Sequence, residues 1–89
     1  MKTENEVKTI LMTMFNIDSE VQVLDREKER VLYLIESISV SSDLTIGTVL
    51  ELCDKIANAI GGELYGTVNF DFTVHDKITF EMMVEQFRN

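Results

Sequence analysis

Apolar residues recur at helical spacing near the start of the chain. The series is Val7, Ile10, Leu11, Met14 and Phe15, and steps of three and four residues bring side chains to one face of an α-helix. The preceding segment Thr3-Glu4-Asn5-Glu6 has the Thr-x-x-Glu form of a capping box, in which each side chain accepts from the other residue's backbone N–H. We therefore predict a helix from about Thr3 to Phe15, with Asn16 as its left-handed stop.

A second helical stripe lies in the middle of the chain. Its apolar members are Ile46, Val49, Leu50, Cys53, Ile56, Ala57 and Ile60. The opposite side carries Glu51, Asp54, Lys55 and Asn58, as expected of an amphipathic surface helix. The pair Gly61-Gly62 predicts the end of this helix, because glycine readily adopts the left-handed conformation of a helix stop.

The C-terminal third alternates between apolar and polar residues, which is typical of β-strands with one buried face. The alternating runs are 68–74 and 78–84. We expect them to form a hairpin around the three-residue loop His75-Asp76-Lys77. This loop would place Val74 opposite Ile78, and Phe72 opposite Phe80, with the large side chains on one face.

The segment Val21–Val40 is ambiguous. Its apolar runs flank the charged turn 25–28, as in a hairpin, but Val31, Leu34, Ile35 and Ile38 also have helical spacing. We favour strands because 38–41 continues the run with β-branched and Ser residues. The predicted fold is then α+β, in the order αββαββ, with two amphipathic helices on one face of a four-stranded antiparallel sheet. The alternative is three helices plus a C-terminal β-hairpin, an order similar in outline to that of winged-helix proteins.

Composition adds bounds on organisation and location. The 89 residues contain no proline and one cysteine, and they show no linker, so we expect residues 1–89 to form a single compact domain. Cys53 cannot form an internal disulfide, and with only one histidine there is no zinc ligand set. The polar N-terminus and the absence of a long apolar run predict neither secretion nor membrane insertion. We expect a cytoplasmic protein without a cofactor.

Candidate catalytic residues are few. Asp71, His75 and Asp76 lie near one another in the predicted C-terminal hairpin, but turns favour such polar residues for solvation alone. No apolar surroundings are expected there to shift a pKa. Cys53 lies on the buried stripe of the second helix, where a small cysteine acts as a hydrophobe. We therefore do not expect an enzyme.

Charge is the feature that most favours a function. The chain has 16 acidic and 8 basic residues, which disfavours direct binding to nucleic acid. Residues 31–76 contain seven acids and a single base, Lys55. These seven acids are the candidate partner-binding residues: Glu36, Asp43, Glu51, Asp54, Glu63, Asp71 and Asp76. The leading hypothesis is a small non-enzymatic inhibitor or adaptor that binds a basic surface of a partner protein; one form of it is a nucleic-acid mimic, which would occupy the groove of a DNA- or RNA-binding protein. Acidity that serves only solubility is the simpler interpretation.

The alternative function is a homo-oligomeric structural or accessory subunit. The patterns leave Met12, Met83 and one of Tyr33 or Leu34 facing outward, and methionine suits adaptable contact surfaces. If these residues cluster, they indicate an oligomer face; a sheet edge would be a second route to a homodimer. Salt separates the two hypotheses, because charge-led docking weakens as ionic strength rises.

Overall fold

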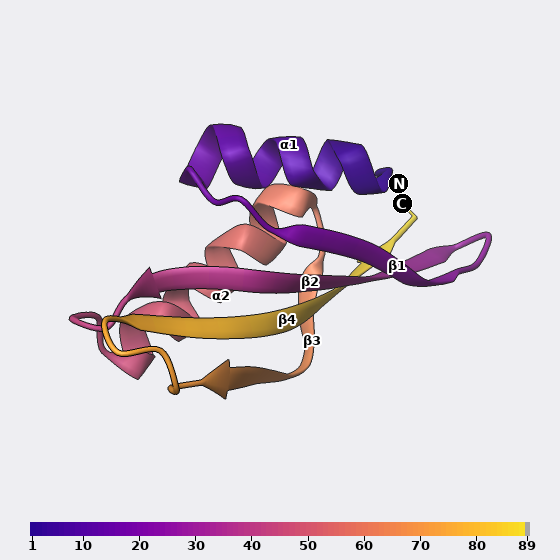
Figure 1. The fold of residues 1–89 in the computed structure, drawn as a ribbon. Helices are drawn as coiled ribbons and strands as arrows, with labels where there is room; N and C mark the ends of the chain where they lie inside the picture. The colour runs from indigo at the N-terminus through magenta and orange to yellow at the C-terminus, as the bar shows by residue number, and fades with distance from the viewer. Residues whose placement is uncertain (89) are drawn as a thin grey trace.

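The structure is a computed structural model, and it describes residues 1–88. Two helices and four strands follow one another in the predicted order αββαββ (Figure 1). Their bounds are α1 Glu4–Phe15, β1 Glu20–Arg26, β2 Arg30–Ser41, α2 Ile46–Ile60, β3 Glu63–Asp71 and β4 Lys77–Phe87. The predicted α+β class is confirmed, and the alternative with a third helix is wrong. The segment Val21–Val40 forms two antiparallel strands.

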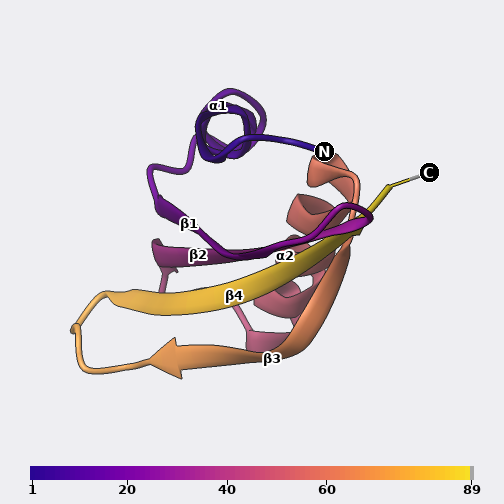
Figure 2. The same cartoon turned by 90° about the vertical axis from the view of Figure 1, so that its right-hand side faces the viewer.

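The sheet has the strand order β1-β2-β4-β3, and each pair of neighbours is antiparallel. Both helices lie on one side of it, α1 beside β1 and α2 against β3 and β4 (Figures 1 and 2). Among residues 1–88 no helix covers the opposite side. We call that side the open face.

Short-range signals set the helix ends, and the capping box and the Asn16 stop of α1 are where the sequence predicts them. The Thr3 hydroxyl accepts from the Glu6 backbone N–H at 3.2 Å, and the Glu6 carboxylate accepts from the Thr3 N–H at 3.1 Å, which completes the capping box. Asn16 ends α1 in the left-handed conformation, with φ 55°. The Thr45 hydroxyl caps α2 by accepting from the Thr48 N–H.

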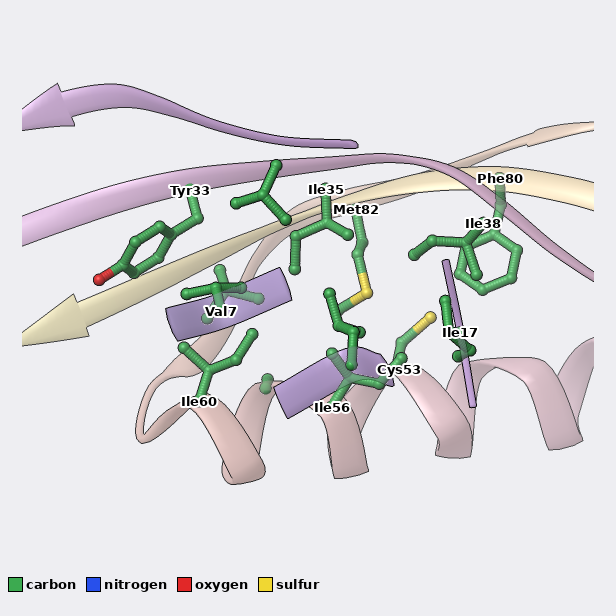
Figure 3. Close-up of a cluster of buried hydrophobic side chains, with 14 of the residues drawn as sticks. Val7, Ile17, Tyr33, Ile35, Ile38, Cys53, Ile56, Ile60, Phe80 and Met82 are labelled. Atoms are coloured by element: carbon green, nitrogen blue, oxygen red, sulfur yellow. The ribbon is translucent and has the colours of Figure 1, made fainter. Parts of the chain in front are cut away.

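The core lies between the helices and the sheet (Figure 3). Tyr33 is fully buried, and its hydroxyl donates to the Lys2 carbonyl at 2.6 Å. The Lys2 backbone N–H also contacts the side chain of Gln86, and the Lys2 ammonium donates to the Ile60 carbonyl. These bonds fasten the start of the chain to β2, β4 and the end of α2, and they satisfy polar groups that burial would otherwise leave unpaired.

The predicted register of the C-terminal hairpin is wrong. Phe70, not Phe72, lies opposite Phe80, and Asp71 lies opposite Thr79. The Asp71 carboxylate accepts from both the hydroxyl and the N–H of Thr73, and this local turn ends β3 at Asp71. The loop is therefore five residues long, 72–76, instead of three. Phe72 stacks on Phe70 and stays 63% exposed.

Strand β3 also begins earlier than the alternation indicates, at Glu63 directly after the two glycines. Gly61 is left-handed, with φ 91°, as a helix stop requires. Gly62 has a different role, because a Cβ atom there would collide with the Glu85 carbonyl oxygen of β4. The absence of a side chain at Gly62 lets the end of α2 turn directly onto the sheet.

Replacing Gly62 with alanine should therefore destabilise the domain. We expect the free energy of unfolding to fall by about 1–3 kcal/mol, because the backbone must shift to relieve the overlap. Urea denaturation followed by circular dichroism measures the change. Gly47→Ala is the matched control, since a Cβ atom there meets only the Thr45 hydroxyl at 3.9 Å. If both variants were equally stable, the close approach at Gly62 would be refuted.

Candidate functional site

An apolar row crosses the open face of the sheet at its centre. Leu34 of β2 lies directly opposite Met83 of β4, and Met83 lies opposite Tyr65 of β3. On the other side, Leu34 lies opposite Gln22 of β1. Residues opposite each other in an antiparallel ladder share one face, so Leu34, Met83 and Tyr65 form an apolar row across three strands, which the polar Gln22 continues onto β1. We call it the central row.

An acidic row runs beside the central row. Glu20 of β1 lies opposite Glu36 of β2. Next to Glu36 the β2–β4 pairing contains an irregularity between Ile35 and Ile38, and Glu81 of β4 falls at that point. The side-chain amide of Asn69 on β3 donates to the Glu81 carboxylate at 3.3 Å. We call Glu20, Glu36 and Glu81 the carboxylate row.

A second set of charges lies on the other side of the central row, around Arg30. Its guanidinium pairs with Glu85 of β4 and, at 3.0 Å, with Asp25 of β1. It also lies over the ring of Tyr65 on β3, at 5.6 Å from the centroid. Glu63 lies opposite Glu85 in the ladder. One basic side chain therefore bridges the strands here and compensates part of the negative charge.

The carboxylate row lacks such compensation. Both ion pairs found among residues 1–88 are made by Arg30, on the far side of the central row. Carboxylates directly opposite each other on neighbouring strands repel, which destabilises a sheet. The repulsion between Glu20 and Glu36 therefore opposes the pairing of β1 with β2, and a cation beside them would relieve it.

A groove of about 210 Å³ lies on the open face over the central row and extends to Glu81 of the carboxylate row. Its apolar wall consists of Leu24, Leu34 and Met83, and its polar end consists of Thr67, Asn69 and Glu81. Leu24 belongs to β1, where a register shift between Val23 and Asp25 displaces it. The groove is smaller than the 300–1,000 Å³ typical of small-molecule sites.

The seven acids singled out from the sequence do not form one cluster. Glu36, Glu63 and Asp71 lie on the open face, at separate places. Glu51 and Asp54 are exposed on α2, on the other side of the molecule. Asp43 and Asp76 lie in the loops after β2 and before β4, which meet where the Ser42 N–H donates to the Asp76 carbonyl.

Asp71 has a local structural role. The hydroxyl and then the backbone N–H of Thr73 donate to its carboxylate, and these bonds lower the pKa of Asp71 below its ordinary value. Sequence reasoning missed Glu20 and Glu81, which lie outside the window 31–76. The alternation of Glu81, Met83 and Glu85 with buried residues along β4 is a sequence signal that places Glu81 on the outer face, whereas Glu20 is placed only by its pairing with Glu36.

The apolar residues expected to face outward cluster in part. Leu34, not Tyr33, is the outward residue of its pair, and it lies opposite Met83 in the central row. Met12 lies apart from them, 46% exposed on α1.

The nucleophile candidate Cys53 is fully buried in the core (Figure 3). Burial, with a smaller contribution from the nearby Asp54 charge, raises its pKa to about 11. Within residues 1–88 no three His, Cys, Asp or Glu side chains are arranged to hold a metal ion. His75 and Asp76 lie in the exposed 72–76 loop.

Cys53 should resist thiol reagents in the folded protein, because the reactive form is the thiolate and its sulfur is buried. At pH 8 we expect the reaction with a disulfide reagent to be at least about a hundredfold slower in native protein than in guanidinium-unfolded protein. The raised pKa has a second consequence. The folded state favours the neutral thiol, and this contribution to the free energy of unfolding is fully present below the ordinary pKa of 9. It is lost as the pH rises through the folded-state pKa of about 11. If the reagent labelled native protein as fast as unfolded protein, the buried position of Cys53 would be contradicted.

Replacing Glu36 with glutamine should stabilise the isolated domain at low ionic strength. Removing one charge relieves repulsion with Glu20 and Glu81, and we expect a gain of at most about 1 kcal/mol in urea denaturation. The gain should shrink as salt screens the charges. Glu51→Gln is the control and should change the free energy of unfolding by only a few tenths of a kcal/mol, because Glu51 is exposed on α2 and its nearest basic residue along the helix is Lys55, four positions on. A loss of stability on Glu36→Gln would refute repulsion within the carboxylate row.

Comparisons with known proteins give no indication of the function of this chain. The chain matches no protein-family model, no curated protein and no solved structure. Neither helix described within residues 1–88 has the length and apolar character needed to cross a membrane. We therefore infer the function from three features of the open face: the central row, the carboxylate row and the groove lined by residues of both.

Proposed function

We propose that this chain is a small non-enzymatic interaction protein, an inhibitor or adaptor, that binds a basic surface of a partner protein through its open face. The observation that carries the proposal is the carboxylate row, in which Glu20 lies opposite Glu36, Glu81 falls at the irregularity next to Glu36, and no basic residue is the ladder partner of any of the three. A partner that brings Lys or Arg side chains would relieve their repulsion, and this gain would appear as binding energy.

The open face also has the composition of a binding surface. Its centre holds Leu34, Met83 and Tyr65, and charged residues lie on both sides. Protein interfaces commonly combine an apolar centre, enriched in aromatic residues and methionine, with a polar rim. The apolar centre would supply affinity, and the acidic rim would select basic partners and accelerate their association.

A surface that binds nucleic acid is one class of target that suits this face. Such surfaces are rich in Lys and Arg, and they bind the regularly spaced negative charges of the phosphate backbone. Carboxylates on neighbouring strands are regularly spaced too, because strands lie about 4.8 Å apart. A reducing compartment, the cytoplasm, suits the single thiol of Cys53.

Self-association through the same face is the second candidate, and the pairing of Leu34 with Met83 favours it. A symmetric dimer buries the same patch on both subunits. Two open faces brought together would place one carboxylate row close to another acidic surface, which is unfavourable. The charge therefore favours a basic partner over a second copy, and we expect a monomer in sedimentation velocity at low salt.

Two double charge reversals test the proposal with a matched control. Glu36→Lys with Glu81→Lys changes the open face, and Glu51→Lys with Asp54→Lys changes α2 by the same total charge. Tagged proteins are used to capture partners from a cell lysate at low and high salt, and mass spectrometry identifies them. We expect the open-face variant to lose basic partners at least tenfold, since each lost ion contact at a desolvated interface removes roughly 1 kcal/mol or more.

The same lysate capture also has outcomes that would contradict the proposal. The α2 variant should retain most partners, and high salt should release them from the wild-type protein. Loss of partners from the α2 variant alone would move the site to the helix. Salt-independent recovery of the domain alone would favour the self-associating subunit. Circular dichroism of each variant confirms that it is folded.

A further inference from the structure

The groove on the open face combines two kinds of surface within one small volume. One wall is aliphatic, formed by Leu24, Leu34 and Met83, while Glu81 places a carboxylate at the other end. A purely apolar side chain bound here would exclude water from the Glu81 carboxylate without pairing its charge, which is unfavourable. A compact ion would leave the aliphatic wall unused. The groove therefore suits a side chain with an apolar stem and a cationic head.

The polar end distinguishes between the two basic side chains. Besides the Glu81 carboxylate, Asn69 and Thr67 line it, and Asn69 uses its side-chain nitrogen to donate to Glu81. The Asn69 amide oxygen and the Thr67 hydroxyl are thus further acceptors at the same end. Several acceptors spread around one point suit the five donors of a planar guanidinium better than the compact ammonium of lysine.

We infer that this groove binds one arginine side chain of the basic partner, with the stem along Leu34 and Met83 and the guanidinium at Glu81. This inference rests on the proposed function and deepens it, because it names the group that anchors the partner. Glu20 and Glu36 continue the carboxylate row away from the groove. Further basic side chains on either side of the arginine would lie next to them.

Three seven-residue peptides test the inference. They are Thr-Lys-Thr-Arg-Thr-Lys-Thr and the same peptide with lysine or with citrulline at its centre. Citrulline keeps the shape of arginine and removes its charge. Titration of labelled protein is followed by NMR of backbone amides and of the Leu and Met methyl groups. We expect the arginine peptide to shift the methyl signals of Leu24, Leu34 and Met83, and to bind about tenfold tighter than the citrulline peptide.

Two variants and a control localise the effect. Glu81→Gln keeps the size of the side chain and should abolish the preference for arginine over citrulline. Leu24→Thr removes part of the apolar wall at a residue that is already 45% exposed, and it should weaken the arginine peptide severalfold. Glu51→Gln on α2 should leave both affinities unchanged.

The outcomes separate the groove from the proposed function. If all three peptides bind with equal affinity and shift Glu20 and Glu36 but not the groove methyls, the groove inference fails and the acidic face stands. Preference for the lysine peptide would overturn the assignment to arginine. If none of the peptides binds at low salt, both the groove and the proposed function are refuted.

Discussion

Burial on only one side of the sheet is the constraint on which this structure depends. Two amphipathic helices supply apolar stripes for one face of a four-stranded sheet, and both lie on that face. The large side chains of the strands turn toward them, including Tyr33, Ile35 and Met82. Because side chains of a strand alternate between its two faces, the residues between these core positions face the opposite side, except at the three register shifts. The open face is therefore the direct consequence of how the core is built.

The open face combines charge pairs that stabilise the sheet with charge pairs that do not. A water-exposed sheet face is stabilised by cross-strand pairs of opposite charge, as Arg30 shows with Asp25 and Glu85. On the other side of the central row the pattern is reversed, because Glu20 and Glu36 lie directly opposite each other. The same face holds an ion-pair bridge that stabilises the sheet and a carboxylate row that does not. This contrast underlies the proposed binding role.

Much of the fold could be predicted from local signals. Three helix ends depend only on hydrogen bonds to residues a few positions away, so the sequence is sufficient to locate them. These ends are the Thr3–Glu6 capping box, Asn16 and Gly61. The hairpin register was not predictable in the same way, because the Asp71 turn ended β3 before the alternation ended. The strand order depends on long-range packing. Glu20, Glu36 and Glu81 are up to 61 positions apart along the chain and meet only through that order.

Carbodiimide cross-linking of the domain to a captured partner tests the central claim most directly. The reagent joins a carboxylate to an amine only where the two are in contact, so mass spectrometry of the linked peptides identifies the acids at the interface. We expect links from Glu20, Glu36 or Glu81 to lysines of the partner. Links confined to Glu51 and Asp54 on α2 would contradict it, because they would place the partner on the helix side of the sheet.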